Sequence, residues 1–165
     1  MPRLALADPK PSGAPDINIF KGIANAPEIL KAFLGFNGAV KSHGGLTAGE
    51  IELISLVGAQ SLGCDYCVNA HTQLAKGAGI DEAHTVAIRK GHGASPREQA
   101  IIEFSRAVMA TKGRVSDADL AKARAAGLDD RQITAVVAMI AIATFTALFN
   151  HVNGTVSDFP AASKI

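Results

Sequence analysis

The sequence has few cysteines, few aromatic residues and no excess of charge. Two cysteines in 165 residues exclude a small secreted protein built around several disulfides, and by themselves they cannot form a four-cysteine zinc site. Sixteen basic and fifteen acidic side chains leave a net charge of +1, so the composition gives no reason to expect binding to nucleic acid or to an anionic membrane. The hydrophobic content of 48% comes mainly from Ala, Leu, Ile and Val, with no Trp and one Tyr. This composition predicts one folded, helical domain.

The N-terminus shows no export signal, because Asp8, Lys10 and two prolines interrupt the apolar stretch that such a signal requires. We expect residues 1–16 to form a mobile or surface-lying arm and residues 17–165 to form a single domain. We also expect a cytoplasmic location, where thiols are normally kept reduced. The two cysteines are then predicted to have a chemical role rather than a structural one.

Residues 132–150 form an uncharged run that approaches a membrane span in length, since about 20 apolar residues cross a bilayer. Three threonines, the lack of aromatic anchors and the lack of a second such run favour a helix inside a domain or a subunit interface. A single span is the alternative. If residues 132–150 form a helix inside the fold, this helix and the apolar run at residues 51–62 together have more apolar surface than one small domain can bury. We therefore predict a homo-oligomer, and we expect no membrane association.

Capping residues and glycines divide the chain into helices. Thr47 with Glu50 and Ser95 with Glu98 have the spacing of capping boxes. No stretch alternates apolar and polar residues long enough to predict a sheet. We predict an all-α fold of about seven helices, which cover residues 25–42, 47–62, 64–77, 81–91, 95–113, 116–127 and the long run that begins at residue 129 or 130.

The motif Cys64-Asp65-Tyr66-Cys67 is followed four residues later by His71. On a helix, positions 64, 67 and 71 share one face, and Cys67 and His71 lie one turn apart. An adjacent imidazole or a helix N-terminus can lower the pKa of a thiol from about 8.5 to about 3.5–7.5, which favours the nucleophilic thiolate. Since a glycine interrupts the preceding helix, both sulfurs are predicted to lie in the first helical turn. A second cysteine at this spacing can capture an oxidised first one as a disulfide.

Two other interpretations of the cysteines remain. The pair could provide half of a zinc site completed by His71 and either Glu52 or His43, or it could be buried and inert. The polar residues around the cysteines do not suit a fully buried segment, which favours a redox-active pair that binds no metal. A thioredoxin fold is disfavoured because its βαβ context is missing.

Glu52 is a further candidate because it lies in the apolar run LTAGEIELISLV, beside residues that we expect to be buried. A carboxylate beside a buried face needs a partner, and a histidine on the next helix could be that partner. A solvated glutamate on the polar side of its helix is the alternative.

These residues resemble the signature of the carboxymuconolactone decarboxylase / alkylhydroperoxidase D-like family. The shared pattern is Glu52, eleven intervening residues, the pair Cys64 and Cys67, three more residues and His71. The likeness is close over residues 46–79, and the segment FNHVNGTVSDFPA is similar to the ending of uncharacterised peroxidase-related members. The resemblance implies an all-α alkylhydroperoxidase D-like domain, assembly into trimers or hexamers, and thiol-dependent reduction of hydroperoxides.

The resemblance also implies a role for each residue. Cys67 would react with the peroxide, Cys64 would resolve the product as a disulfide, and His71 with Glu52 would form a proton relay. Well-described peroxidase members carry a histidine between the cysteines, where this chain has Tyr66. No cofactor is expected. The partners would be a small hydroperoxide and a dithiol reductant, for which a lipoyl-bearing protein is a candidate.

Two other functions stay open, namely a disulfide oxidoreductase or redox sensor, and a lactone-decarboxylase-like member with a non-redox function. The decarboxylase branch typically lacks the cysteine pair, which argues against lactone decarboxylation. Among the other histidines, His43 and His92 lie in glycine-rich junctions and His84 is expected on a solvated face. Tyr66 and His151 are candidates to surround the catalytic residues, although His151 could be purely structural.

Overall fold

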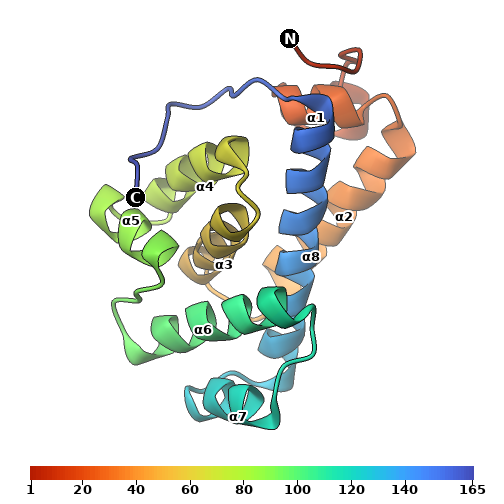
Figure 1. Cartoon of the computed structure of the whole chain (residues 1–165). Coiled ribbons are helices and arrows are strands. Elements are labelled where there is room, and N and C mark those ends of the chain that lie inside the picture. Colours follow the sequence, from red (N-terminus) through yellow and green to blue (C-terminus); the bar gives the residue numbers. More distant parts are fainter.

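In the computed structural model, which describes residues 1–165, the chain is all-α, as the sequence predicts (Figure 1). The α-helices are α1 (Asn18–Ile23), α2 (Pro27–His43), α3 (Ala48–Ser61), α4 (Asp65–Gly77), α5 (Glu82–Lys90), α6 (Pro96–Thr111), α7 (Asp117–Ala125) and α8 (Asp130–Asn153), and a short 3-10 helix covers Lys10–Ser12. The expectation of seven helices missed α1. Six residues are too few to show a periodic pattern, and Ile17 at its N-cap has no side chain that could cap it.

Helix α3 lies at the centre of the fold and contacts α4, α5, α6 and α8 (Figure 1). Every residue from Ile51 to Ala59 is buried, which explains why this helix is apolar on nearly all sides. The predicted capping box at its start is confirmed, because Thr47 and Glu50 each accept a hydrogen bond from the other's backbone N–H. From this start, α3 carries Glu52 into the interior of the molecule.

Helix α8 is long and apolar enough, by length and composition, to cross a membrane. Within the fold it packs against α1, α2, α3, α4 and α6, as the core helix of a globular domain does. Its other side and the adjoining side of α2 carry exposed apolar side chains, which are Ile29, Phe36, Val137, Phe145, Leu148 and Val152. We call these residues the α2–α8 face.

The two ends of the chain are tied to the helices that build the site. The backbone N–H of Arg3 donates to the carbonyl of Asn153 at 2.7 Å, which joins the N-terminal arm to the end of α8. After α8, residues 155–165 turn back over α4 and reach α5, and we call them the C-terminal segment (Figure 1). Arg89 on α5 donates to the carbonyl of Ser163 at 2.6 Å. The segment is also held against α4, the helix that carries the second cysteine, because the backbone N–H of Ala162 donates to Asn69 Oδ1 at 2.9 Å.

Candidate functional site

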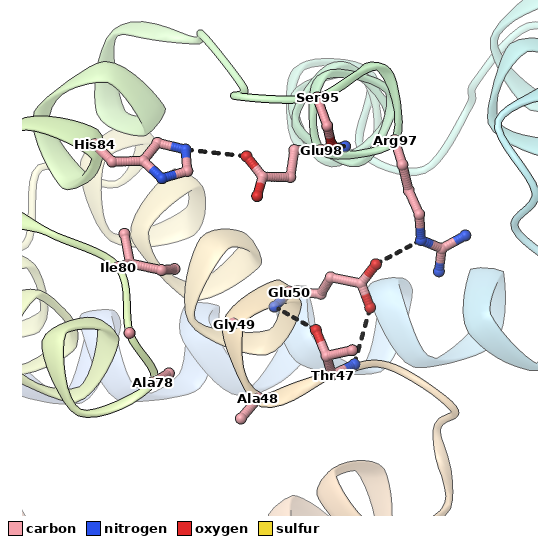
Figure 2. A pocket seen from close by; sticks show the side chains of 11 residues that line it. Thr47, Ala48, Gly49, Glu50, Ala78, Ile80, His84, Ser95, Arg97 and Glu98 are labelled. Atoms are coloured by element: carbon pink, nitrogen blue, oxygen red, sulfur yellow. Dashed lines mark hydrogen bonds and ion pairs between the residues drawn. The ribbon is translucent and has the colours of Figure 1, made fainter.

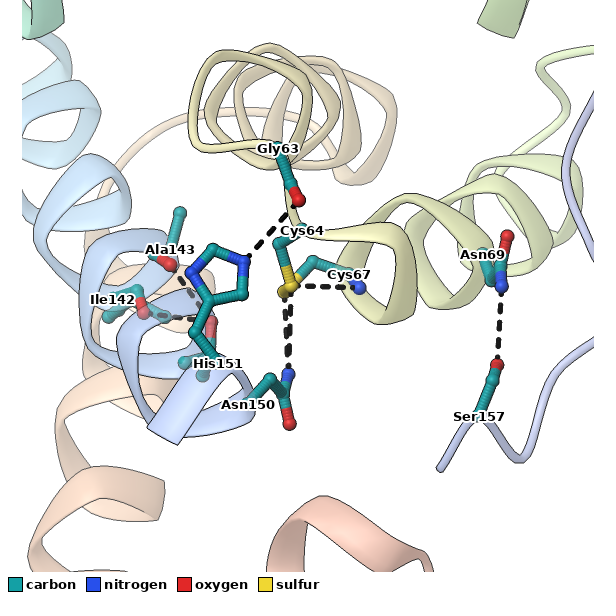
Figure 3. The surroundings of a disulfide bond; sticks show 10 residues. Gly63, Cys64, Cys67, Asn69, Ile142, Ala143, Asn150, His151 and Ser157 are labelled. Atoms are coloured by element: carbon teal, nitrogen blue, oxygen red, sulfur yellow. Dashed lines mark hydrogen bonds between the residues drawn. A yellow bond between two sulfur atoms is a disulfide. The ribbon is translucent and has the colours of Figure 1, made fainter. Parts of the chain in front are cut away.

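The turn between α3 and α4 positions the two cysteines. Gly63 adopts a left-handed conformation, with φ at +63°, and Cys64 is the N-cap residue of α4. Cys64 and Cys67 form a disulfide (Figure 3). Cys64 Sγ also accepts a hydrogen bond from the backbone N–H of Cys67 at 3.2 Å. Both sulfurs thus lie at the start of α4, where backbone N–H groups and the helix dipole favour a thiolate.

Glu52 on α3 and His71 on α4 form a hydrogen-bonded pair one helical turn after Cys67. Glu52 Oε2 lies 2.7 Å from His71 Nδ1, and the glutamate is only 6% exposed. The buried carboxylate gains a partner, and in return it holds the imidazole with Nδ1 as the donor. This leaves His71 Nε2 to accept or return a proton, on the same face of α4 as Cys67.

Asn150, near the end of α8, lies against the disulfide and was missed by the sequence analysis. Its Nδ2 lies 3.5 Å from Cys67 Sγ and 3.8 Å from Cys64 Sγ (Figure 3). The residue is 4% exposed, and its Oδ1 has no hydrogen-bond partner. An unsatisfied buried acceptor costs about 1–3 kcal/mol, so this side chain is not placed there for stability alone. Its only signal in the sequence is a polar residue within an apolar helix.

His151, the residue after Asn150, contacts the turn that holds the cysteines. Its Nε2 lies 3.3 Å from the carbonyl oxygen of Gly63, and its side chain is exposed (Figure 3). This contact joins the end of α8 to the start of α4, which are far apart in the sequence.

Tyr66, between the cysteines, binds the C-terminal segment. Its hydroxyl donates to Asp158 Oδ2 at 2.7 Å, and its ring packs edge-on against Phe159 with the ring centroids 5.8 Å apart. Burial and the hydrogen bond to the Asp158 carboxylate raise the pKa of Tyr66 above its ordinary value. The hydroxyl therefore stays protonated at neutral pH and anchors the C-terminal segment to α4.

We expect Tyr66→Phe to lower the free energy of unfolding by about 1–2 kcal/mol, because the variant loses a hydrogen bond to a charged group. The raised pKa gives this contribution a pH dependence. It is fully present below the unfolded-state pKa of about 10 and is lost as pH rises further, because only the unfolded chain then ionises readily. Urea unfolding from pH 7 to 11 measures both effects. A difference between the two proteins that stays constant up to pH 11 would contradict the linkage.

A separate cavity of about 540 Å³ lies between α5 and the N-termini of α3 and α6 (Figure 2). His84 Nε2 lies 3.0 Å from Glu98 Oε2 across it, and Arg97 Nε lies 2.6 Å from Glu50 Oε1. His84 is therefore paired and partly buried, which corrects the expectation of a solvated His84. No predicted site residue lines this cavity. Neither here nor at the cysteines are three or more His, Cys, Asp or Glu side chains arranged to hold a metal ion.

The chain is similar to known proteins in both sequence and fold. The family model of the carboxymuconolactone decarboxylase family matches residues 27–89, which contain the glutamate, both cysteines and the histidine of the site. A search of curated proteins finds no match to the chain.

Three solved structures show the same fold at low identity. An uncharacterized peroxidase-related protein with an alkylhydroperoxidase AhpD core, from Ralstonia eutropha JMP134, has a TM-score of 0.79 at 24% identity, over 86% of this chain and 76% of that chain. A peroxidase-related protein from Silicibacter sp. TM1040 has a TM-score of 0.76 at 19% identity, over 82% and 73% of the two chains. The debrominase Bmp8, in complex with 2,3,4-tribromopyrrole, has a TM-score of 0.74 at 14% identity, over 86% and 76%. The chain therefore has the alkylhydroperoxidase D-like helical fold of these structures, and its residues 27–89 match the carboxymuconolactone decarboxylase family.

Proposed function

We propose that the protein is a thiol-dependent peroxidase that reduces hydrogen peroxide or alkyl hydroperoxides. The observation that supports this best is the Cys64–Cys67 disulfide one helical turn before the Glu52–His71 pair. A peroxide-oxidised cysteine pair ends as such a disulfide, and a histidine at this place can move the protons of the reaction. The family and the peroxidase-related neighbours are consistent with this proposal.

In the first step, Cys67 attacks the peroxide. Cys67 is one turn from His71 and, at 5% exposed against 1%, is the more accessible of the two cysteines. His71 Nε2 takes the proton of the thiol, and the thiolate attacks the distal oxygen of RO–OH. The S–O bond forms as the O–O bond breaks. His71 then returns the proton to the leaving RO⁻, which departs as an alcohol or as water, and Cys67 is left as a sulfenic acid.

In the second step, Cys64 resolves the sulfenic acid. Its sulfur displaces the hydroxyl group from Cys67, which forms the disulfide and releases water. A dithiol then reduces this disulfide by thiol–disulfide exchange and leaves as a disulfide itself. The dithiol of a lipoyl-bearing protein in the cytoplasm is our candidate reductant. All electrons pass through sulfur, so the proposed cycle uses no cofactor.

Treatment of the reduced protein with one equivalent of peroxide tests the proposal. We expect both thiols to disappear and the mass to fall by two hydrogen atoms, and we expect continuous peroxide consumption only when a dithiol is present. Unchanged thiols would contradict the peroxidase proposal. A disulfide that forms without turnover would favour a redox sensor instead, and an activity that survives serine at both cysteines would favour a non-redox function.

We also propose that the chain forms a homo-oligomer, a trimer or a hexamer, through the α2–α8 face. Val137, Phe145 and Leu148 recur along one side of α8, and Leu148 is 55% exposed. The rings of Phe33 on α2 and Phe145 on α8 pack with centroids 5.4 Å apart, so the two helices form one continuous apolar surface. Such a surface on a small domain is typical of a subunit interface.

The oligomer proposal predicts a mass several times that of the 17.0 kDa chain in light scattering at micromolar concentration. Phe36→Lys combined with Leu148→Lys should reduce the mass, because two charges would be buried at the interface. Leu74→Lys, an equally exposed apolar position on α4, is the control and should leave the mass unchanged. A monomeric wild-type protein would contradict the proposal.

A further inference from the structure

Two buried asparagines lie in the last turn of α8, and only one of them has a structural explanation. Asn153 accepts a hydrogen bond from the backbone N–H of Leu4 at 2.9 Å and donates to Thr155 Oγ1 at 3.0 Å, so both ends of its amide are used. Asn150 makes no such bonds. Its Nδ2 faces the two sulfurs and its Oδ1 has no partner. The structural role that explains the buried amide of Asn153 therefore does not explain the buried amide of Asn150.

The orientation of the Asn150 amide follows from the chemistry of its neighbours. A cysteine sulfur accepts hydrogen bonds in the disulfide and accepts them more strongly as a thiolate, so the NH₂ group faces the sulfurs. Figure 3 shows Nδ2 directed at the disulfide and Oδ1 on the other side of the same amide. The result is a donor aimed at the reacting sulfur, and an unpaired acceptor beside it.

We propose that Asn150 is a catalytic residue that stabilises the Cys67 thiolate through Nδ2 and binds the O–H group of the substrate through Oδ1. This inference rests on the proposed peroxidase function and names the residue that would select its hydroperoxide substrates. The group that Oδ1 can bind is a hydrogen-bond donor on the oxygen that reaches Cys67 Sγ. Hydrogen peroxide and alkyl hydroperoxides have this O–H on their distal oxygen, whereas dialkyl peroxides do not.

The contacts of Nδ2 with the sulfur and of Oδ1 with the O–H group agree with the bonds that form and break in the first step. The distal oxygen keeps its hydrogen as it moves to sulfur, so the O–H bound by Asn150 Oδ1 becomes the hydroxyl of the Cys67 sulfenic acid. The negative charge leaves sulfur for the departing RO⁻, which takes its proton from His71 rather than from Asn150. Asn150 therefore orients the peroxide and holds charge on Cys67, but it neither gains nor loses a proton.

The test compares two reagents on the reduced protein with Cys64→Ser, so that only Cys67 reacts. Methyl methanethiosulfonate reacts with the thiolate and has no O–H or N–H group, whereas tert-butyl hydroperoxide needs both contacts. For Asn150→Leu at pH 7 we expect the rate with the thiosulfonate to fall about tenfold and the rate with the hydroperoxide about a hundredfold, as one and two lost hydrogen bonds would give. Asn150→Asp keeps the acceptor and loses the donor, so both rates should fall by the same factor.

Asn69→Ala is the matched control, because Asn69 bonds Ser157 and Ala162 of the C-terminal segment, and its side chain points away from the sulfurs (Figure 3). It should leave both rates unchanged. Unchanged rates in folded Asn150→Leu would overturn the proposal, and equal falls with the two reagents would overturn the binding of the peroxide O–H. If wild-type Cys67 reacts with the hydroperoxide no faster than a free thiol, the peroxidase proposal fails, while the thiosulfonate rates still decide whether Asn150 stabilises the thiolate.

Discussion

Cys67→Ser is expected to reduce peroxide consumption to the level of the buffer, whereas Cys64→Ser is expected to leave the first step intact. The physical reason is the position of Cys67, one turn before His71 and with Asn150 Nδ2 closer to its sulfur than to that of Cys64. With Cys64 absent, no thiol can displace the hydroxyl group of the oxidised Cys67. The sulfenic acid should therefore accumulate in Cys64→Ser and be detected by a dimedone adduct in the mass spectrum.

A competing effect makes this experiment decisive. Cys64 is the N-cap of α4 and its sulfur accepts the backbone N–H of Cys67, which also favours a thiolate at Cys64. If the adduct forms only in Cys67→Ser, Cys64 is the residue that attacks the peroxide and the two roles are exchanged. Serine at both positions is the control, and it should give no adduct.

The sequence predicts best those parts of the molecule that depend on local spacing. The capping box of Thr47 and Glu50, the break at Gly63 and the placement of Cys64 and Cys67 in the first turn of α4 each involve residues a few positions apart. Helical geometry fixes such relations without knowledge of the tertiary fold. The prediction that Glu52 has a histidine partner concerns only two helices that follow each other in the chain. Because a short turn joins α3 to α4, the two helices must lie close together.

The contacts that the sequence does not predict are those that α8 and the C-terminal segment make with α4. Asn150 contacts sulfurs that lie more than 80 positions earlier in the chain, and Asp158 binds Tyr66 across a similar separation. Nothing in a helical pattern specifies which helix end meets which turn. Tyr66 illustrates the consequence, because the sequence predicts only that it lies near the catalytic residues, while the structure shows its hydroxyl bound to the C-terminal segment.

Glu52→Gln is expected to slow peroxide turnover by about 10²-fold, at the low end of the usual contribution of general acid–base groups. Glutamine keeps the shape of the side chain and can still accept the hydrogen bond from His71 Nδ1, so the fold should persist. The neutral amide no longer stabilises the imidazolium that forms when His71 takes the Cys67 proton. The rate of Cys67 with methyl methanethiosulfonate should therefore reach half of its maximum at a higher pH than in the wild type.

Glu50→Gln is the matched control for this prediction, because Glu50 lies on the same helix but bonds Thr47 and Arg97 instead of His71. The Thr47 and Arg97 contacts hold the pKa of Glu50 below its ordinary value even though its partial burial acts in the opposite direction. Glu50 is thus ionised at neutral pH, and its replacement should lower stability without changing the reactivity of Cys67. A Glu52→Gln variant with wild-type turnover and an unshifted pH profile would show that the Glu52–His71 bond is structural, and the chemistry would then rest on the cysteines and His71 without the carboxylate.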